Sequence, residues 1–231
     1  MAMIRRTNNS VFPKKSCKDV FHAFMLEGCE LDGYFDIPLI KATGFMPESL
    51  ISFSEAIRQK RPSGPGMFIH FYEHDQKFER FWNNPRRYLK TIRRFAGVIS
   101  PDFSLYRDMP DPLKRFNNFR NFTCGAWLQN QGLQVIANVR SCGYDSFGYA
   151  LAGAPKNSVI AIGTHGFLKN LPNRLLFIEE IRFIVDLLQP SAIIVFGSTA
   201  YGVFDYAKRL GVDVRCYPAQ ASKMSGCGNN E

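Results

Sequence analysis

The stretch Ser158-Val-Ile-Ala-Ile-Gly-Thr-His-Gly166 carries four consecutive apolar residues that pass directly into a polar turn flanked by glycines. A second stretch of the same kind is Ser191-Ala-Ile-Ile-Val-Phe-Gly-Ser-Thr199. A continuous apolar run of strand length is typical of a strand that is covered on both faces, as in a parallel sheet. These two stretches therefore predict a buried parallel sheet with polar turns at its carboxyl edge.

Similar runs recur on both sides of these stretches. The predicted strands are Met67–Tyr72, Gly97–Ser100, Gln134–Val139, Ser158–Gly163, Ala192–Gly197 and Val212–Tyr217. The segments predicted as helices between them are Asn84–Phe95, Pro112–Asn130, Asn173–Leu188 and Ala200–Leu210. In the third helix the predicted apolar stripe runs through Leu175, Ile178, Arg182, Val185 and Leu188. Strands that start 20 to 37 residues apart suit right-handed crossovers between parallel strands.

This alternation predicts an α/β fold with a mainly parallel sheet of six to seven βα units. Tyr34–Ile40 is the candidate seventh strand, and Glu48–Lys60 is predicted to form a helix. An incomplete (β/α) barrel is favoured, and an open doubly wound sheet is the alternative. The turn-rich stretch at 61–66 predicts a boundary between an N-terminal segment, 14–66, that packs on the main body and an α/β domain, 67–218. Residues 1–13 and 219–231 are expected to be disordered.

Composition excludes several classes of protein. The chain has 231 residues, of which 45% are hydrophobic, so it can bury a sizeable core. No apolar run reaches the roughly 20 residues that span a bilayer, and we expect no membrane association. The six cysteines form no CxxC pair, and the N-terminus lacks an apolar secretory segment. We therefore expect free thiols and a cytoplasmic protein.

The positive charge is unevenly distributed along the chain. The formal net charge is +9, and residues 1–120 carry 20 basic against 13 acidic side chains. Within this half, Lys77–Phe95 combines an apolar stripe with basic residues at helical spacing, namely Arg86, Arg87, Lys90, Arg93 and Arg94. A cationic helix face is typical of a phosphate-backbone contact, and a solvated surface helix is the alternative. Nucleic acid or a nucleotide is therefore a candidate partner.

Polar side chains follow the ends of five successive predicted strands. Because parallel strands send their carboxyl ends to one edge, these residues are expected on one face. The candidate catalytic residues are Asp102, Arg107, Asp108 and His165. The candidate substrate-binding residues are Ser104, Arg140, Thr164, Ser198 and Thr199. Glu73, Asp75 and Asp102 are candidate ligands of Mg²⁺, because carboxylate oxygens suit that ion.

Each of these residues also has a structural interpretation. Asp102 is suited to general-base work or to capping a helix, and Ser198 is suited to capping or to holding phosphate. Arg140 ends an apolar strand, where a guanidinium is costly unless it is paired or faces an anionic ligand. His165 is the preferred acid–base group among the four histidines, because it lies in a turn and titrates near neutrality.

Several segments resemble a bacterial and phage family of unknown function, DUF4417. They are the stretches Gly97–Met109, Asn138–Arg140, Ala161–Gly166, Phe78–Arg86 and Gly125–Gln129. The resemblance extends from Asp19 to Tyr217 and departs from the family pattern at Ser141, where a tryptophan is usual. It implies a phage or mobile-element setting and implies no particular reaction.

Three functions are consistent with these observations. The first is an enzyme, of hydrolase type, that acts on a nucleotide or nucleic acid through the strand-end residues. The second is a non-catalytic accessory that binds nucleic acid through the cationic helix. The third is an interaction module, such as an inhibitor of host defence.

Overall fold

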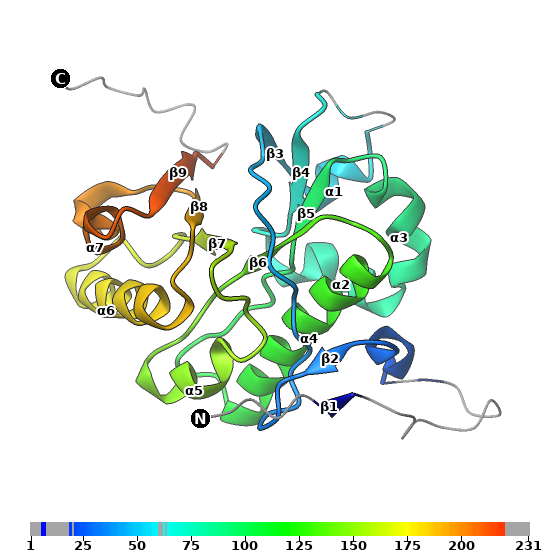
Figure 1. Cartoon of the computed structure of the whole chain (residues 1–231), viewed down its shortest axis with the longest axis horizontal. Coiled ribbons are helices and arrows are strands. Elements are labelled where there is room, and N and C mark those ends of the chain that lie inside the picture. The colour runs from blue at the N-terminus through cyan, green and yellow to red at the C-terminus, as the bar shows by residue number, and fades with distance from the viewer. Residues whose placement is uncertain (1–5, 8–18, 20, 60–61, 63, 220–231) are drawn as a thin grey trace.

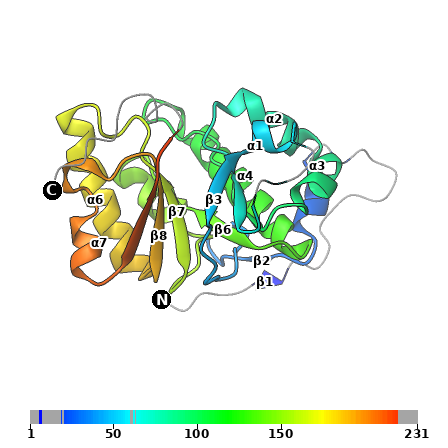
Figure 2. The same ribbon diagram turned by 90° about the horizontal axis from the view of Figure 1, so that it is seen from above.

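The computed structural model describes residues 6–7, 19, 21–59, 62 and 64–219. Its centre is a seven-stranded sheet in which every pair of neighbouring strands is parallel and the strands follow one another in chain order, from β3 to β9. The sheet curls into a half-barrel whose helices lie on its outer side (Figures 1 and 2). The predicted α/β fold and incomplete barrel are confirmed.

The strands of this sheet are β3 (Ser49–Ser52), β4 (Met67–His70), β5 (Gly97–Ile99), β6 (Val135–Asn138), β7 (Val159–Gly163), β8 (Ala192–Phe196) and β9 (Asp213–Tyr217). The helices between them are α1 (Phe53–Ala56), α2 (Asp75–Asn83), α3 (Pro85–Ile92), α4 (Asp111–Asn130), α5 (Phe147–Ala150), α6 (Leu171–Leu188) and α7 (Asp205–Arg209). Short 3₁₀ helices occur at Ala23–Leu26, Tyr144–Ser146 and Ala200–Gly202. A separate antiparallel pair joins β1 (Arg6–Thr7) to β2 (Glu30–Leu31).

The apolar strands form two buried layers, one on each face of the sheet. On the inner face, alternate residues such as Phe68, Ile99 and Ile136 pack against one another across the half-barrel. The intervening residues point outward, where Val98 packs with α2–α4 and Ile160 packs with α6 and α7. Burial on both faces explains why these strands lack polar alternation.

Local sequence signals start several of these helices. Asn84 caps α3 by accepting a hydrogen bond from the Arg87 amide, and Pro85 occupies the first helical position. Asn170 accepts from the Asn173 amide in the same way at α6. The Ser52 hydroxyl accepts a hydrogen bond from the Glu55 amide and so caps α1, which follows β3 without an intervening loop.

The predicted seventh strand was wrong, and the helix predicted after it is confirmed only over α1, Phe53–Ala56. Tyr34–Ile40 is irregular apart from an isolated bridge between Leu31 and Pro38, and the seventh strand is β3, within the segment predicted as the helix Glu48–Lys60. Ser49–Ser52 is only four residues long, and pairing with β4 decides its conformation. A strand this short has no periodicity that the sequence alone reveals.

One of the predicted helices is interrupted, since Ala200–Leu210 forms a 3₁₀ turn followed by α7. The predicted helix Asn84–Phe95 corresponds to α3, and the rest of the cationic segment lies in the separate helix α2. In α6 the buried face runs through Phe177, Ile181 and Ile184, whereas Leu175 and Arg182 are exposed. Of the predicted stripe, Val185 and Leu188 are buried and Ile178 packs against the same core.

The N-terminal segment packs against α4 and supplies the first strand of the sheet. Because β3 precedes residue 66, the sheet begins before the predicted boundary of the α/β domain. Of the termini predicted to be disordered, Arg6–Thr7 form β1 and Ala219 is described, while the remaining residues of 1–13 and 219–231 lie outside the described ranges. No helix among the described residues is long and apolar enough to cross a membrane.

Candidate functional site at the carboxyl ends of the strands

An ion pair joins the ends of β5 and β6. Arg140 lies two residues beyond β6, and its Nη1 donates to Oδ2 of Asp102 at 2.7 Å. The Asp102 side chain is 10% exposed and that of Arg140 is 20% exposed, so solvent only partly screens the pair. The two residues predicted separately as catalytic and substrate-binding therefore act as one unit.

Asn138 and Tyr72 extend this pair along the same edge. Asn138 Nδ2 donates to Oδ1 of Asp102 at 2.9 Å, and the Tyr72 hydroxyl donates to Oδ1 of Asn138 at 2.9 Å. Asp102 thus accepts hydrogen bonds on both of its oxygens. A carboxylate held in this way is a positioning group for Arg140, and it is less suited to removing a proton from a substrate.

Aromatic rings form one side of this polar network. The Tyr72 ring stacks on Phe196 at 4.9 Å between centroids, and His70 lies 4.3 Å from the same Phe196 ring. Burial raises the pKa of Tyr72 well above its ordinary value and lowers the pKa of His70 to about 4. Both side chains are therefore neutral near pH 7 and act through shape and hydrogen bonding. The His70 side chain is buried.

Arg140 keeps unused hydrogen-bonding capacity. Its Nε is buried and has no hydrogen-bond partner among the described residues. Burial works against the charged form of Arg140, but Asp102 outweighs it and raises the pKa of the guanidinium. With Nη1 on Asp102, the Nε–Nη2 edge makes no hydrogen bond to another described residue. In proteins generally, this edge of arginine suits two parallel hydrogen bonds to phosphate or carboxylate.

The carboxylates predicted as Mg²⁺ ligands serve separate contacts. Asp75 accepts from both the amide and the hydroxyl of Ser104, at 3.1 and 2.9 Å, which also occupies that candidate substrate-binding residue. Glu73 accepts from the Ser54 amide and lies 3.8 Å from the Lys77 amine. No group of three or more His, Cys, Asp or Glu side chains in the described residues could hold a metal ion.

Thr164 and Ser198 join the ends of β7 and β8. The Thr164 hydroxyl accepts from the Ser198 amide at 2.9 Å, and the Ser198 hydroxyl accepts from the Ala200 amide at 3.1 Å. Both hydroxyls therefore stabilise the turn that follows β8. Thr199 is the half-buried residue that precedes the 3₁₀ turn at Ala200–Gly202.

The remaining predicted catalytic residues are exposed. His165, Arg107 and Asp108 lie on loops after β7 and β5, and none of their side chains forms a hydrogen bond or an ion pair with another described residue. The structure thus brings Asp102 and Arg140 into contact and places His165 in solvent on the loop after the adjoining strand. Roles for these three residues stay predictions.

The sequence analysis missed a buried carboxyl group on α6. Glu180 on α6 is 2% exposed, and its Oε1 has no hydrogen-bond partner in the described part of the chain. Burial raises its pKa to about 7, although the nearby Ser141 hydroxyl, Gly143 amide and Arg107 and Arg140 charges oppose the rise. Its spacing from Phe177 and Ile184 was the signal that could have revealed it, because all three share one helix face.

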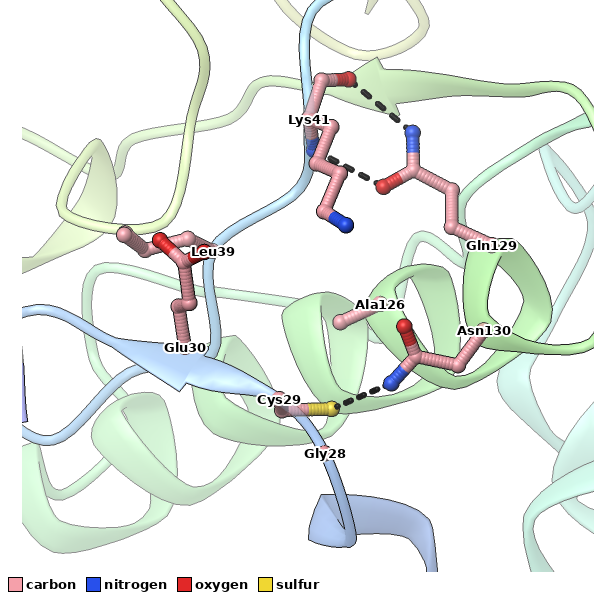
Figure 3. Close-up of a pocket in the computed structure, with 8 residues that line it drawn as sticks. All are labelled: Gly28, Cys29, Glu30, Leu39, Lys41, Ala126, Gln129 and Asn130. Carbon is pink, nitrogen blue, oxygen red and sulfur yellow. Dashed lines mark hydrogen bonds between the residues drawn. The ribbon is translucent and has the colours of Figure 1, made fainter. Parts of the chain in front are cut away.

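A pocket elsewhere in the molecule is lined by residues that are poorly suited to catalysis. It lies between the N-terminal segment and α4 (Figure 3), where the Gln129 amide binds the backbone of Lys41 on both its N–H and its carbonyl. Asn130 donates to the Cys29 sulfur, and burial raises the pKa of that thiol to about 11. A thiol with this pKa is protonated at neutral pH and is a poor nucleophile.

Comparison with known proteins extends these observations. Residues 29–212 match the family described as "Domain of unknown function (DUF4417)". The chain is 28% identical over 167 residues to the Gene 1 protein of Mycobacterium phage D29, which covers 72% of this chain and 62% of the phage protein. It is 29% identical over 168 residues to the Gene 1 protein of Mycobacterium phage L5, covering 73% of each. No solved structure shows significant similarity to the chain.

Proposed function

The chain belongs to the DUF4417 family, and from this premise we propose that it binds a phosphate-bearing substrate, a nucleotide or nucleic acid, at the carboxyl ends of its parallel strands. The similarity to Gene 1 proteins of two mycobacteriophages is consistent with a phage setting for this function. We further propose that the protein acts in the cytoplasm.

The observation that carries the proposal is the Nε–Nη2 edge of Arg140. Asp102 holds the guanidinium through Nη1 at 2.7 Å, and the buried Nε has no partner among the described residues. A buried donor without a partner costs about 1–3 kcal/mol, which an anionic ligand would offset. Carboxyl ends of parallel strands are also the usual place for ligands in α/β folds.

The contacts support binding more strongly than hydrolysis. Asp102 already accepts from Arg140 and Asn138, so it serves to orient the guanidinium. His165 is exposed on the loop beyond β7 and is the histidine nearest in sequence to the end of that strand. We therefore assign Arg140 to anion binding, Asp102 and Asn138 to its positioning, and an acid–base role, if the ligand is turned over, to His165.

Calorimetric titration tests this proposal with inorganic phosphate, nucleoside mono-, di- and triphosphates, and a short oligonucleotide. We expect the wild-type protein to bind at least one of these ligands, and Arg140→Gln to weaken that binding tenfold or more. Arg140→Lys keeps the charge but loses the two-donor edge, so it should remain clearly weaker than wild type.

Arg182→Gln is the matched control, because it removes an exposed guanidinium that is paired with Glu179 on the outer face of α6. Thermal melts guard against loss of folding in Arg140→Gln, which leaves Asp102 without its ion-pair partner. Failure of the wild-type protein to bind any of the ligands, or equal affinity of Arg140→Gln and wild type, would refute the proposal.

A further inference from the structure

Seven cations of α2, α3 and the residues directly after α3 form an exposed surface that we call the α2–α3 cationic surface. Its members are Lys77, Arg80, Arg86, Arg87, Lys90, Arg93 and Arg94, all of which are exposed. Figure 1 shows α2 and α3 on the opposite side of the molecule from α6, α7 and β9. The helix break at Asn84 keeps the cations of both helices in solvent.

Nearby acids neutralise only a small part of this surface. Glu79 is the only acid between residues 76 and 96, and its carboxylate accepts two hydrogen bonds from Arg120 Nη1, at 2.7 and 2.9 Å. Of the acids just before α2, Asp75 binds Ser104, and Glu73 binds the Ser54 amide and lies 3.8 Å from the Lys77 amine. The surface therefore carries a strong local excess of positive charge.

Protein contacts hold Arg86 and Arg93 in place without using most of their donors. Arg86 lies 4.1 Å above the Phe24 ring, a contact that uses a face of the group and none of its N–H bonds. Arg93 donates one hydrogen bond, from Nη2 to the Gln131 carbonyl at 3.2 Å. Five of the seven cations are arginines, whose planar groups suit phosphate oxygens.

The apolar side of the two helices indicates which polyanion fits. Phe78, Phe81, Trp82 and Ile92 are buried in the core. No apolar side chain of this group is therefore available to enter a lipid bilayer, as a membrane-surface helix requires. An array of exposed cations without hydrophobic insertion fits the regularly spaced phosphates of a nucleic-acid backbone.

We infer that the α2–α3 cationic surface binds the phosphate backbone of nucleic acid without reading base sequence, through residues that take no part in the Arg140 site. Binding of this kind depends on salt, because each neutralised phosphate releases counterions. It does not depend on whether Arg140 binds a ligand.

Fluorescence anisotropy with two labelled DNA duplexes of unrelated sequence tests this inference across a series of salt concentrations. The variant is Arg86→Gln/Arg87→Gln/Lys90→Gln/Arg93→Gln. We expect wild type to bind both duplexes alike. The variant should bind more weakly, with a log–log salt slope that is smaller by about 0.9 for each phosphate that it no longer neutralises.

The matched control is Arg182→Gln/Lys208→Gln/Arg209→Gln/Arg215→Gln, which removes the same charge from exposed positions on α6, α7 and β9. It should keep the wild-type salt slope. If the fourfold variant fails to fold, Arg87→Gln/Lys90→Gln gives the same comparison through two exposed side chains.

Four outcomes would overturn the inference. They are undetectable binding by wild type at low salt, equal weakening by the control variant, a strong preference for one duplex sequence, and binding to anionic phospholipid vesicles in place of DNA. Calorimetry with inorganic phosphate and nucleotides tests the Arg140 site separately, whereas the oligonucleotide is expected to bind the α2–α3 cationic surface as well.

Discussion

Single residues at the sheet edge combine stability with a capacity for binding. Asp102 and Arg140 form an ion pair at 2.7 Å. Arg140 Nε and Glu180 Oε1, however, have no hydrogen-bond partner among the described residues. Buried polar atoms without partners cost stability, and proteins tolerate them mainly where they serve a function. The clearest consequence is a dependence of stability on pH that comes from Glu180.

The Glu180→Gln variant should remove a fall in stability between pH 4.5 and about 7. The folded-state pKa of Glu180 is about 7 against an ordinary value of 4.5, because burial disfavours its charge. The folded state therefore binds the proton more tightly, and the free energy of unfolding decreases as pH rises through this window. The loss reaches up to about 3 kcal/mol, at about 1.4 kcal/mol for each pKa unit. Urea unfolding at a series of pH values measures it.

His70 contributes with the opposite sign, because its pKa is lowered to about 4 and its stabilisation is lost as pH falls below 6.5. Subtracting the Glu180→Gln curve from the wild-type curve isolates Glu180, since His70 is unchanged in both. Glu179→Gln, an exposed neighbour paired with Arg182, should leave the wild-type curve unaltered. A Glu180→Gln curve parallel to that of wild type would show that the group ionises normally.

At the scale of elements, turns at the carboxyl edge fix the geometry of the site. The β8 turn depends on Gly197, whose φ of +123° lies in a region that side chains disfavour. A Cβ there would also collide with the Thr164 hydroxyl, which accepts a hydrogen bond from the Ser198 amide. The turn therefore ties the end of β8 to that of β7 only when residue 197 is glycine.

Gly197→Ala should lower the free energy of unfolding by about 1–3 kcal/mol or more, because backbone strain and a steric clash add together. Gly132→Ala is the matched control, since Gly132 also has a positive φ, +82°, but no atom lies within 4 Å of an added Cβ. Chemical denaturation gives the loss of unfolding free energy for each variant. The loss in Gly132→Ala reports backbone strain alone, and the loss in Gly197→Ala reports strain together with the clash. Equal losses would mean that Thr164 moves aside at no cost.

At the scale of the whole molecule, the strands of the half-barrel differ in how well they are buried and paired. The central strands β6 and β7 pair on both sides and are almost entirely buried, whereas β9 pairs only with β8 and is largely exposed. Curling brings the strand ends around Asp102 and Arg140 close together without closing the barrel.

Native-state hydrogen exchange should therefore rank the strands. We expect amides of β6 and β7 to exchange only through global unfolding, and those of β9 to exchange through local opening. The measurement is residue-resolved exchange by NMR or mass spectrometry in increasing denaturant. Protection of β9 equal to that of β7 would indicate that another part of the protein, or a second copy, covers this edge.

The sequence by itself determined the parallel sheet, because continuous apolar runs such as Val159–Ile162 are stable only when both faces are covered. It also placed Asp102 and Arg140 at one edge, since parallel strands end on the same side. Only the tertiary structure decided that these two residues pair, that Ser49–Ser52 is the seventh strand, and that Glu180 is buried. The physical reason is that such outcomes depend on contacts between distant segments, which override the weak local preferences of short strands and single polar residues.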